Sequence, residues 1–331
     1  MGRIYIIAEA GVNHNGDVGI AKELIRKAKE AGADAVKFQT FIADELAAPN
    51  ARTAGYQAKN IGTESQLEML RKLEFTFQTF AELREYSGKI GIDFLSTPFD
   101  LKSIDFLTKL ELPFIKIPSG EITDKPYLVK IANTGLPVII STGMSTMEEI
   151  QEALQIFNLY PKNKLTLLHC TTEYPAPFSE INLRAMVKLK EVFGYPVGYS
   201  DHTTGIEVSI AAAALGAEVI EKHFTLDKTM EGPDHKASAE PQELQELVNA
   251  VRNIEKAMGD GEKKPSVSEQ KNRNLVRKSI VALRDIVEGE LFTEDNLGVK
   301  RPGDGISPMK WETVLGTVSP RRFKKDEKIE L

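Results

Sequence analysis

Two histidines stand where they could act together on one metal ion. His202 and His223 each follow a short apolar run, in the stretches VGYSDH and VIEKH. If these runs are neighbouring strands, the two imidazoles can bind one divalent cation and leave coordination positions open for substrate or water. A pair of buried, hydrogen-bonded histidines is the alternative that the residues leave open.

Lysines and serines follow other apolar runs. Lys37 and Lys116 end two of them, and a lysine in such surroundings needs an anionic partner to offset its desolvation. Ser119, Ser141 and Ser200 follow further runs. Ammonium groups, hydroxyls and the N–H groups of helix N-termini together could hold a small dianion. Ser141 and Ser200 could instead cap the helices that follow them.

More polar residues belong to the same series. Glu9 and Gln39 end the first two runs, Glu121 follows KIPSG, and Tyr174 stands in HCTTEYP. One polar residue at a strand end is usually solvated, but many such ends meeting at one rim are typical of an active site. Tyr174, next to a proline, most simply marks a rigid loop.

Eight strand candidates must position these residues. Each precedes a stretch with helical periodicity, and a count of eight favours a (β/α)8 TIM barrel over residues 1–260. An open doubly wound sheet is the second candidate, but no Gly-x-Gly-x-x-Gly follows any strand. The strand candidates are Ile4–Ala8, Ala35–Phe38, Asp93–Leu95, Phe114–Ile117, Val138–Ile140, Leu165–Leu168, Val197–Tyr199 and Val219–Glu221.

The last part of the chain differs from the barrel pattern. Residues 261–278 are polar and charged and predict an exposed linker. Residues 279–331 contain short β-like runs and turn signals, which predict a small β-rich domain. This segment is too short for a sizeable core of its own, so we expect it to need a partner surface.

Composition narrows the function classes. The chain has 331 residues, 41% of them hydrophobic and 27% charged, and a formal net charge of −6. The negative charge argues against a nucleic-acid-binding face. No apolar run approaches the roughly 20 residues of a membrane span, and the opening segment is a poor signal peptide. The single cysteine, Cys170, suits a reducing compartment, so we expect a soluble cytoplasmic protein.

A series of motifs, taken in order, resembles one enzyme family. The stretches IAEAGVNHNGD, VKFQT, FLSTPFD, KIPSGE, STGM, LLHCTTEYP, GYSDHT and EKHFTLD together resemble the sialic acid synthase (nonulosonate synthase) family. The C-terminal segment with VKRPGDGI resembles the antifreeze-like (SAF) domain of these enzymes. The resemblance covers essentially the whole chain.

The resemblance implies a reaction and a role for each site residue. Members of the family condense phosphoenolpyruvate with an open-chain N-acylated amino sugar, using Mn²⁺ or Mg²⁺, and release phosphate and a nine-carbon 2-keto acid. They are typically homodimers in which each small domain covers the partner's barrel. By motif, the metal ligands would be His202 and His223; phosphoenolpyruvate would contact Lys37, Gln39, Lys116, Ser119, Ser141 and Ser200; the sugar would contact Glu9, Thr172, Tyr174, Asp234 and Arg301; and the catalytic groups would be Glu121, Glu9 and Lys116.

One position departs from the family pattern. Synthases that use N-acetylmannosamine read Cys-Thr-Asn-x-Tyr-Pro, whereas this chain has Thr172 in place of the Asn. Losing the carboxamide favours a less polar sugar, and the Thr form resembles the legionaminic acid synthase branch, whose substrate is 2,4-diacetamido-2,4,6-trideoxymannose. The product would be N,N'-diacetyllegionaminate. N-acetylneuraminate synthase and pseudaminate synthase are the alternatives within the family.

Two other classes are considered. A barrel metallohydrolase could also use two histidines and acids, but the His-x-His ligand pair common in such barrels is missing. A non-enzymatic protein with an ice- or carbohydrate-binding module would not need the crowded rim of lysines and histidines. We therefore expect an enzyme, a transferase.

Overall fold

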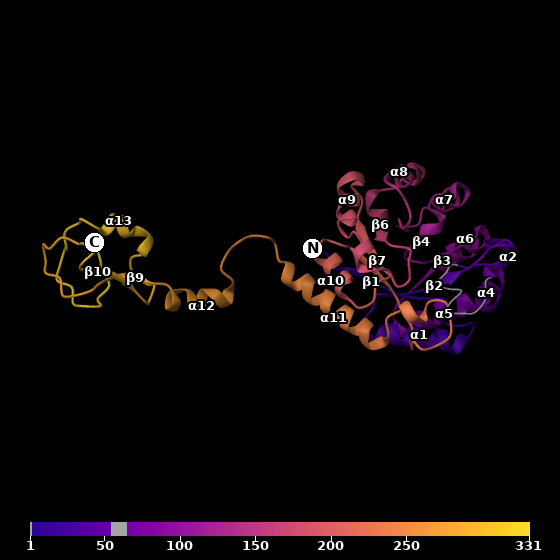
Figure 1. The fold of residues 1–331 in the computed structure, drawn as a ribbon, viewed down its shortest axis with the longest axis horizontal. Helices are drawn as coiled ribbons and strands as arrows, with labels where there is room; N and C mark the ends of the chain where they lie inside the picture. Colours follow the sequence, from indigo (N-terminus) through magenta and orange to yellow (C-terminus); the bar gives the residue numbers. More distant parts are fainter. Residues whose placement is uncertain (1, 54–64) are drawn as a thin grey trace. The chain divides into compact units, whose positions relative to one another are not determined.

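The computed structural model describes residues 2–53 and 65–331. It divides into two compact units, Met1–Asp260 and Gly261–Leu331. Eight parallel strands form the centre of the first unit (Figure 1). They are β1 (Tyr5–Gly11), β2 (Ala35–Thr40), β3 (Asp93–Pro98), β4 (Ile115–Ile117), β5 (Val138–Ser141), β6 (Leu165–Cys170), β7 (Val197–Asp201) and β8 (Val219–His223).

The strand order closes the sheet on itself. The sequence of neighbours is β3-β2-β1-β8-β7-β6-β5-β4, with β1 pairing β8 in parallel. The outer strands β3 and β4 also lie side by side. Every strand candidate of the sequence corresponds to one of these strands. The prediction of a (β/α)8 TIM barrel is confirmed.

Helices pack around the strands of this unit (Figure 1). Several begin at a side chain that accepts a hydrogen bond from the first turn: Asp17 accepts from the N–H of Ile20, and Thr146 forms a capping box with Glu149. The helices are α1 (Val18–Glu30), α2 (Ala43–Leu46), α4 (Gln66–Leu73), α5 (Phe77–Ile90), α6 (Leu101–Leu107), α7 (Lys125–Ala132), α8 (Met147–Ile156), α9 (Arg184–Phe193), α10 (Glu207–Ala214) and α11 (Pro241–Met258).

The interior of the barrel is apolar in one layer and polar in the next. The apolar layer contains Ile7, Ala35, Leu95, Ile139, Leu168 and Val219. Side chains of a strand alternate between its two faces, so the residue two positions further along points into the barrel again. Those positions hold Glu9, Lys37, Thr97, Ser141, Cys170 and Glu221. The carboxyl ends of the strands therefore carry a ring of polar side chains above an apolar floor.

β7 lacks a side chain at the level of the apolar layer. A Cβ added to Gly198 would lie 2.3 Å from the carbonyl oxygen of Val219 and 2.6 Å from Leu168 Cδ2. Only glycine fits at this close approach of β7 to β8 and β6. The backbone of β7 can then present Ser200 and His202 beside the side chains of β8.

The second unit has its own small fold. β9 (Ser279–Ala282) and β10 (Leu297–Lys300) pair antiparallel, and α13 (Trp311–Val314) packs near them. A small core of buried apolar residues fills this unit: Ile280, Ala282, Ile286, Phe292, Leu297, Val314, Phe323 and Ile329. The unit therefore encloses a small apolar core.

The segment predicted as an exposed linker contains a helix, α12 (Val267–Val276). Ser266 and Glu269 form a capping box at its start, which explains why a polar segment becomes helical here. No α12 residue is buried within the described structure. Among the described residues, no helix of either unit is long and apolar enough to span a bilayer.

Candidate active site

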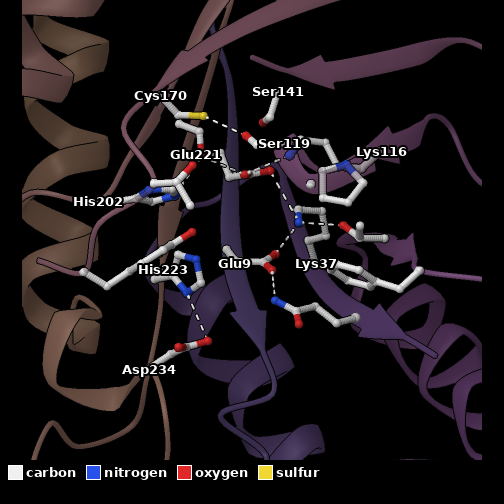
Figure 2. Close-up of a pocket in the computed structure, with 18 of the residues that line it drawn as sticks. Glu9, Lys37, Lys116, Ser119, Ser141, Cys170, His202, Glu221, His223 and Asp234 are labelled. Carbon is white, nitrogen blue, oxygen red and sulfur yellow. Dashed lines mark hydrogen bonds and ion pairs between the residues drawn. The ribbon is translucent and has the colours of Figure 1, made fainter. Parts of the chain in front are cut away.

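A cavity of about 320 Å³ opens at the carboxyl ends of the barrel strands. Figure 2 shows side chains from many strands pointing into it. Twelve of the residues predicted from the sequence line this cavity: Glu9, Lys37, Gln39, Lys116, Ser119, Ser141, Thr172, Tyr174, Ser200, His202, His223 and Asp234. The predicted rim is thus one continuous pocket.

Two lysines and two glutamates meet at the bottom of the cavity (Figure 2). Lys37 Nζ lies 2.7 Å from Glu9 Oε2 and 3.5 Å from Glu221 Oε2, and Lys116 Nζ lies 3.3 Å from Glu221 Oε1. All four side chains are buried. Each lysine therefore has the anionic partner that its position at the end of an apolar strand requires.

The two carboxyl groups differ in proton affinity. Burial raises the pKa of Glu9 to about 7, against the lowering effect of the Lys37 ammonium. Burial acts in the same direction on Glu221, but the Lys116 and Lys37 ammonium groups outweigh it and hold the pKa of Glu221 well below its usual range. Glu221 is therefore a fixed anion, whereas Glu9 can exchange a proton near neutral pH.

The serines predicted to hold an anion are not helix caps. Thr146 caps α8, and the residue before α10 makes no side-chain cap hydrogen bond, so neither Ser141 nor Ser200 acts as a cap. Ser119 Oγ accepts a hydrogen bond from the Gly143 N–H at 3.0 Å. Ser141 and Ser200 are buried in the cavity wall. Their hydroxyls could donate to an anion between the lysines once Ser200 turns its proton away from Glu221 Oε1.

His202 and His223 lie next to each other in the cavity, with ring centroids 5.4 Å apart. His202 Nδ1 lies 2.6 Å from the Thr171 carbonyl oxygen, so this nitrogen carries the proton and donates it. Its Nε2 lies 3.2 Å from Ser200 Oγ, whose own proton goes to Glu221 Oε1 at 2.9 Å. Because the Ser200 proton is donated to Glu221, the lone pair on His202 Nε2 accepts no proton from Ser200.

Burial keeps both imidazoles neutral. It lowers the pKa of His202 to about 4 and the pKa of His223 well below its usual value. His223 Nδ1 is buried, has no hydrogen-bond partner among the described residues, and lies 3.9 Å from Asp234 Oδ2. Neutral imidazoles with free lone pairs are the form that binds divalent cations. In the described part of the chain no group of three or more His, Cys, Asp or Glu residues is placed to hold a metal ion. A cation held by the two imidazoles would need substrate or water to complete its coordination.

Four of the residues predicted to face a sugar line the cavity: Glu9, Thr172, Tyr174 and Asp234. Tyr174 stacks on His202 at a centroid distance of 4.1 Å, and Gln39 Nε2 donates to Glu9 Oε1 at 3.3 Å. Burial raises the pKa of Asp234 to about 6. Thr172 Oγ1 is a buried atom without a hydrogen-bond partner in the described structure. A polar molecule bound beside the histidines could satisfy these groups.

Two predicted residues lie elsewhere. Glu121, in the short turn Ser119–Glu121 after β4, is half-buried and is not part of the cavity wall. Burial and the nearby Asp124 raise its pKa. Arg301 belongs to the second unit, where its Nε donates to the Val276 carbonyl oxygen at 2.9 Å. The place of Arg301 at the cavity of the first unit stays a prediction.

Among the cavity residues that sequence reasoning missed, Glu221 and Thr97 contact the lysines. Glu221 joins the two lysines and Ser200, and Thr97 Oγ1 accepts a hydrogen bond from Lys37 Nζ at 2.8 Å. The signal for Glu221 was present, because it stands two residues before His223 on the same strand. Strand alternation puts both side chains on the same face.

Comparisons with known proteins identify the family of this chain. The model of the NeuB family matches residues 24–263, and that of the SAF domain matches residues 277–330. The chain is 57% identical to the N,N'-diacetyllegionaminic acid synthase of Campylobacter jejuni, covering 99% of both chains. It is 50% identical to the enzyme of the same name from Legionella pneumophila, covering 95% of this chain and 89% of the relative. A crystal structure of N-acetylneuraminic acid synthetase from Leptospira borgpetersenii, in complex with citrate, has a TM-score of 0.74 and 38% identity, covering 82% of this chain and 90% of that one.

Proposed function

Because this chain belongs to the NeuB family, we propose that it condenses phosphoenolpyruvate with 2,4-diacetamido-2,4,6-trideoxymannose. The products would be N,N'-diacetyllegionaminate and phosphate. The observation that carries the proposal is the buried group of Lys37, Lys116, Glu9 and Glu221 beside two neutral histidines. It supplies an anion cradle and a cation site in one cavity.

The lysine side of the cavity is suited to phosphoenolpyruvate. Lys37 and Lys116 are held by carboxylates, and the hydroxyls of Ser119, Ser141 and Ser200 surround them. Fixed ammonium and hydroxyl donors can stabilise the carboxylate and phosphate of the substrate without reorganising during the reaction. Displacing a carboxylate contact from each lysine would free it for the incoming anion.

The histidine side of the cavity is suited to the aldehyde. His202 and His223 would hold Mn²⁺ or Mg²⁺, which supplies Lewis-acid polarisation of the aldehyde oxygen when bound. Glu9, Tyr174 and Asp234 would orient the open-chain sugar. This leaves the aldehyde carbon facing the phosphoenolpyruvate between the lysines.

The reaction then proceeds in two stages. C3 of phosphoenolpyruvate attacks the aldehyde carbon, and the aldehyde oxygen takes a proton, for which Glu9 with its pKa of about 7 is the best-placed donor. Water adds to the electron-deficient C2 and gives up a proton to a base. The tetrahedral intermediate collapses with cleavage of the bond between C2 and the phosphate oxygen, which releases phosphate.

The choice of sugar is tested with a substrate panel. We expect a higher kcat/KM for phosphate release with the 6-deoxy diacetamido sugar than with N-acetylmannosamine or the altrose isomer. The replacement Thr172→Asn restores a carboxamide. We expect it to reduce the difference in kcat/KM between the 6-deoxy diacetamido sugar and N-acetylmannosamine. A wild-type preference for N-acetylmannosamine would identify an N-acetylneuraminate synthase instead, and a preference for the altrose isomer a pseudaminate synthase.

The proposal includes the assembly and its location. Each SAF domain would cover the barrel of a partner subunit in a homodimer and bring Arg301 to the sugar. A planar guanidinium can donate several hydrogen bonds to an N-acyl oxygen or to hydroxyls. We place the enzyme in the cytoplasm, because its single cysteine suits a reducing compartment.

A further inference from the structure

A buried ion pair lies behind the two histidines. Lys222 Nζ is 3.0 Å from Asp201 Oδ2, with exposed side-chain fractions of 3% and 0%. Asp201 immediately precedes His202, and Lys222 immediately precedes His223. The two residues are direct partners in the register of β7 and β8. Neither lines the cavity, because alternation turns them to the outer face of the sheet.

Both members of this pair make further hydrogen bonds. Asp201 Oδ1 accepts from the Thr203 N–H at 2.9 Å and from Thr203 Oγ1 at 2.7 Å. Asp201 Oδ2 also accepts from Ser209 Oγ on α10 at 2.6 Å, and Lys222 Nζ donates to the Thr203 carbonyl oxygen at 2.9 Å. The network thus holds the residues on both sides of His202 and ties them to the residue before His223.

The pair stands out from its surroundings. The preceding outward residues of the same strands, Tyr199 and Ile220, belong to the apolar core between sheet and helices. Well-packed apolar residues usually stabilise a protein interior as much as a buried ion pair does, or more. A charged pair at this level therefore has a purpose other than stability, and the next residue of each strand is a histidine that lines the cavity.

We infer that the Asp201–Lys222 pair positions the two imidazoles for metal binding. It fixes the ends of β7 and β8 relative to each other, and with them the backbone from which His202 and His223 extend. Both are positioning residues, since neither reaches the cavity. The inference rests on the metal role in the proposed function.

The test is a double-mutant cycle read by metal binding in the absence of substrate. Mn²⁺ affinity is measured by electron paramagnetic resonance of the free ion, and melting temperature by circular dichroism, for Lys222→Met, Asp201→Asn and the double variant. Each single variant leaves a group without its partner and is expected to lower both the melting temperature and the affinity. The double variant leaves no unpaired charge, so its melting temperature is expected to recover while Mn²⁺ binding stays weaker by about 10- to 100-fold.

Arg252→Met is the matched control. Arg252 forms a partly buried ion pair with Asp34 at 2.6 Å, away from the cavity. We expect it to lower the melting temperature and to leave Mn²⁺ affinity unchanged. Ser209→Ala is a milder variant that loses one hydrogen bond to Asp201, and it is expected to weaken Mn²⁺ binding by about two- to tenfold.

The outcomes separate the two claims. Wild-type Mn²⁺ affinity in the double variant overturns the positioning role; if that variant does not fold, unchanged affinity in Ser209→Ala does so. A wild-type chain that binds no Mn²⁺ overturns the metal role in the proposed function, and the positioning role with it.

Discussion

The ammonium group of Lys37 lies 2.7 Å from the carboxylate of Glu9, and both side chains are buried. Burial still raises the pKa of Glu9 to about 7. Its proton is therefore held below that pH and lost above it. A proton at this position, between the anion cradle and the histidines, is available to the aldehyde oxygen when the new carbon–carbon bond forms.

The raised pKa of Glu9 predicts a descending limb in the pH profile of kcat. We expect kcat to fall as pH rises through about 7, because the donor form of Glu9 is then lost. Glu9→Gln should remove this limb and lower kcat by about 10²- to 10⁴-fold. Glu121→Gln is the control and should keep the limb. The reverse result, in which only Glu121→Gln removes it, would assign the role to Glu121 as the sequence predicted.

Removing the metal or either of its ligands should stop turnover. We expect His202→Ala or His223→Ala to abolish phosphate release while the circular dichroism spectrum stays that of the wild type. Chelation of the wild-type enzyme should have the same effect, and added Mn²⁺ should restore the rate. Full activity in the chelated enzyme would rule out the metal.

Lys116→Met should chiefly weaken binding of phosphoenolpyruvate. A hydrogen bond to a charged group contributes about 1.5–3 kcal/mol, so KM for this substrate should rise by about 10- to 150-fold. Lys130→Met is the control, since Lys130 pairs with Asp105 on the surface at 2.6 Å and should leave KM unchanged. An unchanged KM in Lys116→Met would place the anion elsewhere.

Arg301 should act on the barrel of a partner subunit. His202→Ala and Arg301→Ala are each expected to be inactive, but subunit exchange between them should restore activity. A mixed dimer contains one barrel with both histidines that is covered by a small domain with an intact Arg301. Mixed dimers without activity would show that each domain covers its own barrel.

The sequence predicted the barrel and most of the cavity wall for one physical reason. Strand alternation and the meeting of parallel strand ends at one rim follow from local pattern alone, and they bring Lys37, Lys116, His202 and His223 together. The same alternation pointed to Glu221. The family resemblance, which the comparisons confirm, was needed to propose a reaction for the residues at this rim.

Other features depend on contacts that pattern does not encode. The pKa of Glu221 is lower than that of Glu9 because the Lys116 and Lys37 ammonium groups outweigh the effect of burial on Glu221. This difference is a property of the folded cavity. Glu121 follows the KIPSG stretch as expected, but the short turn after β4 carries it out of the wall. The helix α12 was missed although Ser266 and Glu269 gave its start signal, because the polar composition of the segment suggested a linker.

The fate of the bridging oxygen of phosphoenolpyruvate tests the central claim most directly. Phosphoenolpyruvate is labelled with ¹⁸O at the oxygen between C2 and phosphorus and is mixed with the diacetamido sugar, Mn²⁺ and the wild-type enzyme. The masses of both products are then measured by mass spectrometry. We expect one phosphate for each nine-carbon acid, with the ¹⁸O in the phosphate because the C2–O bond breaks. Unlabelled phosphate, or phosphate release that does not depend on the sugar, would contradict the account.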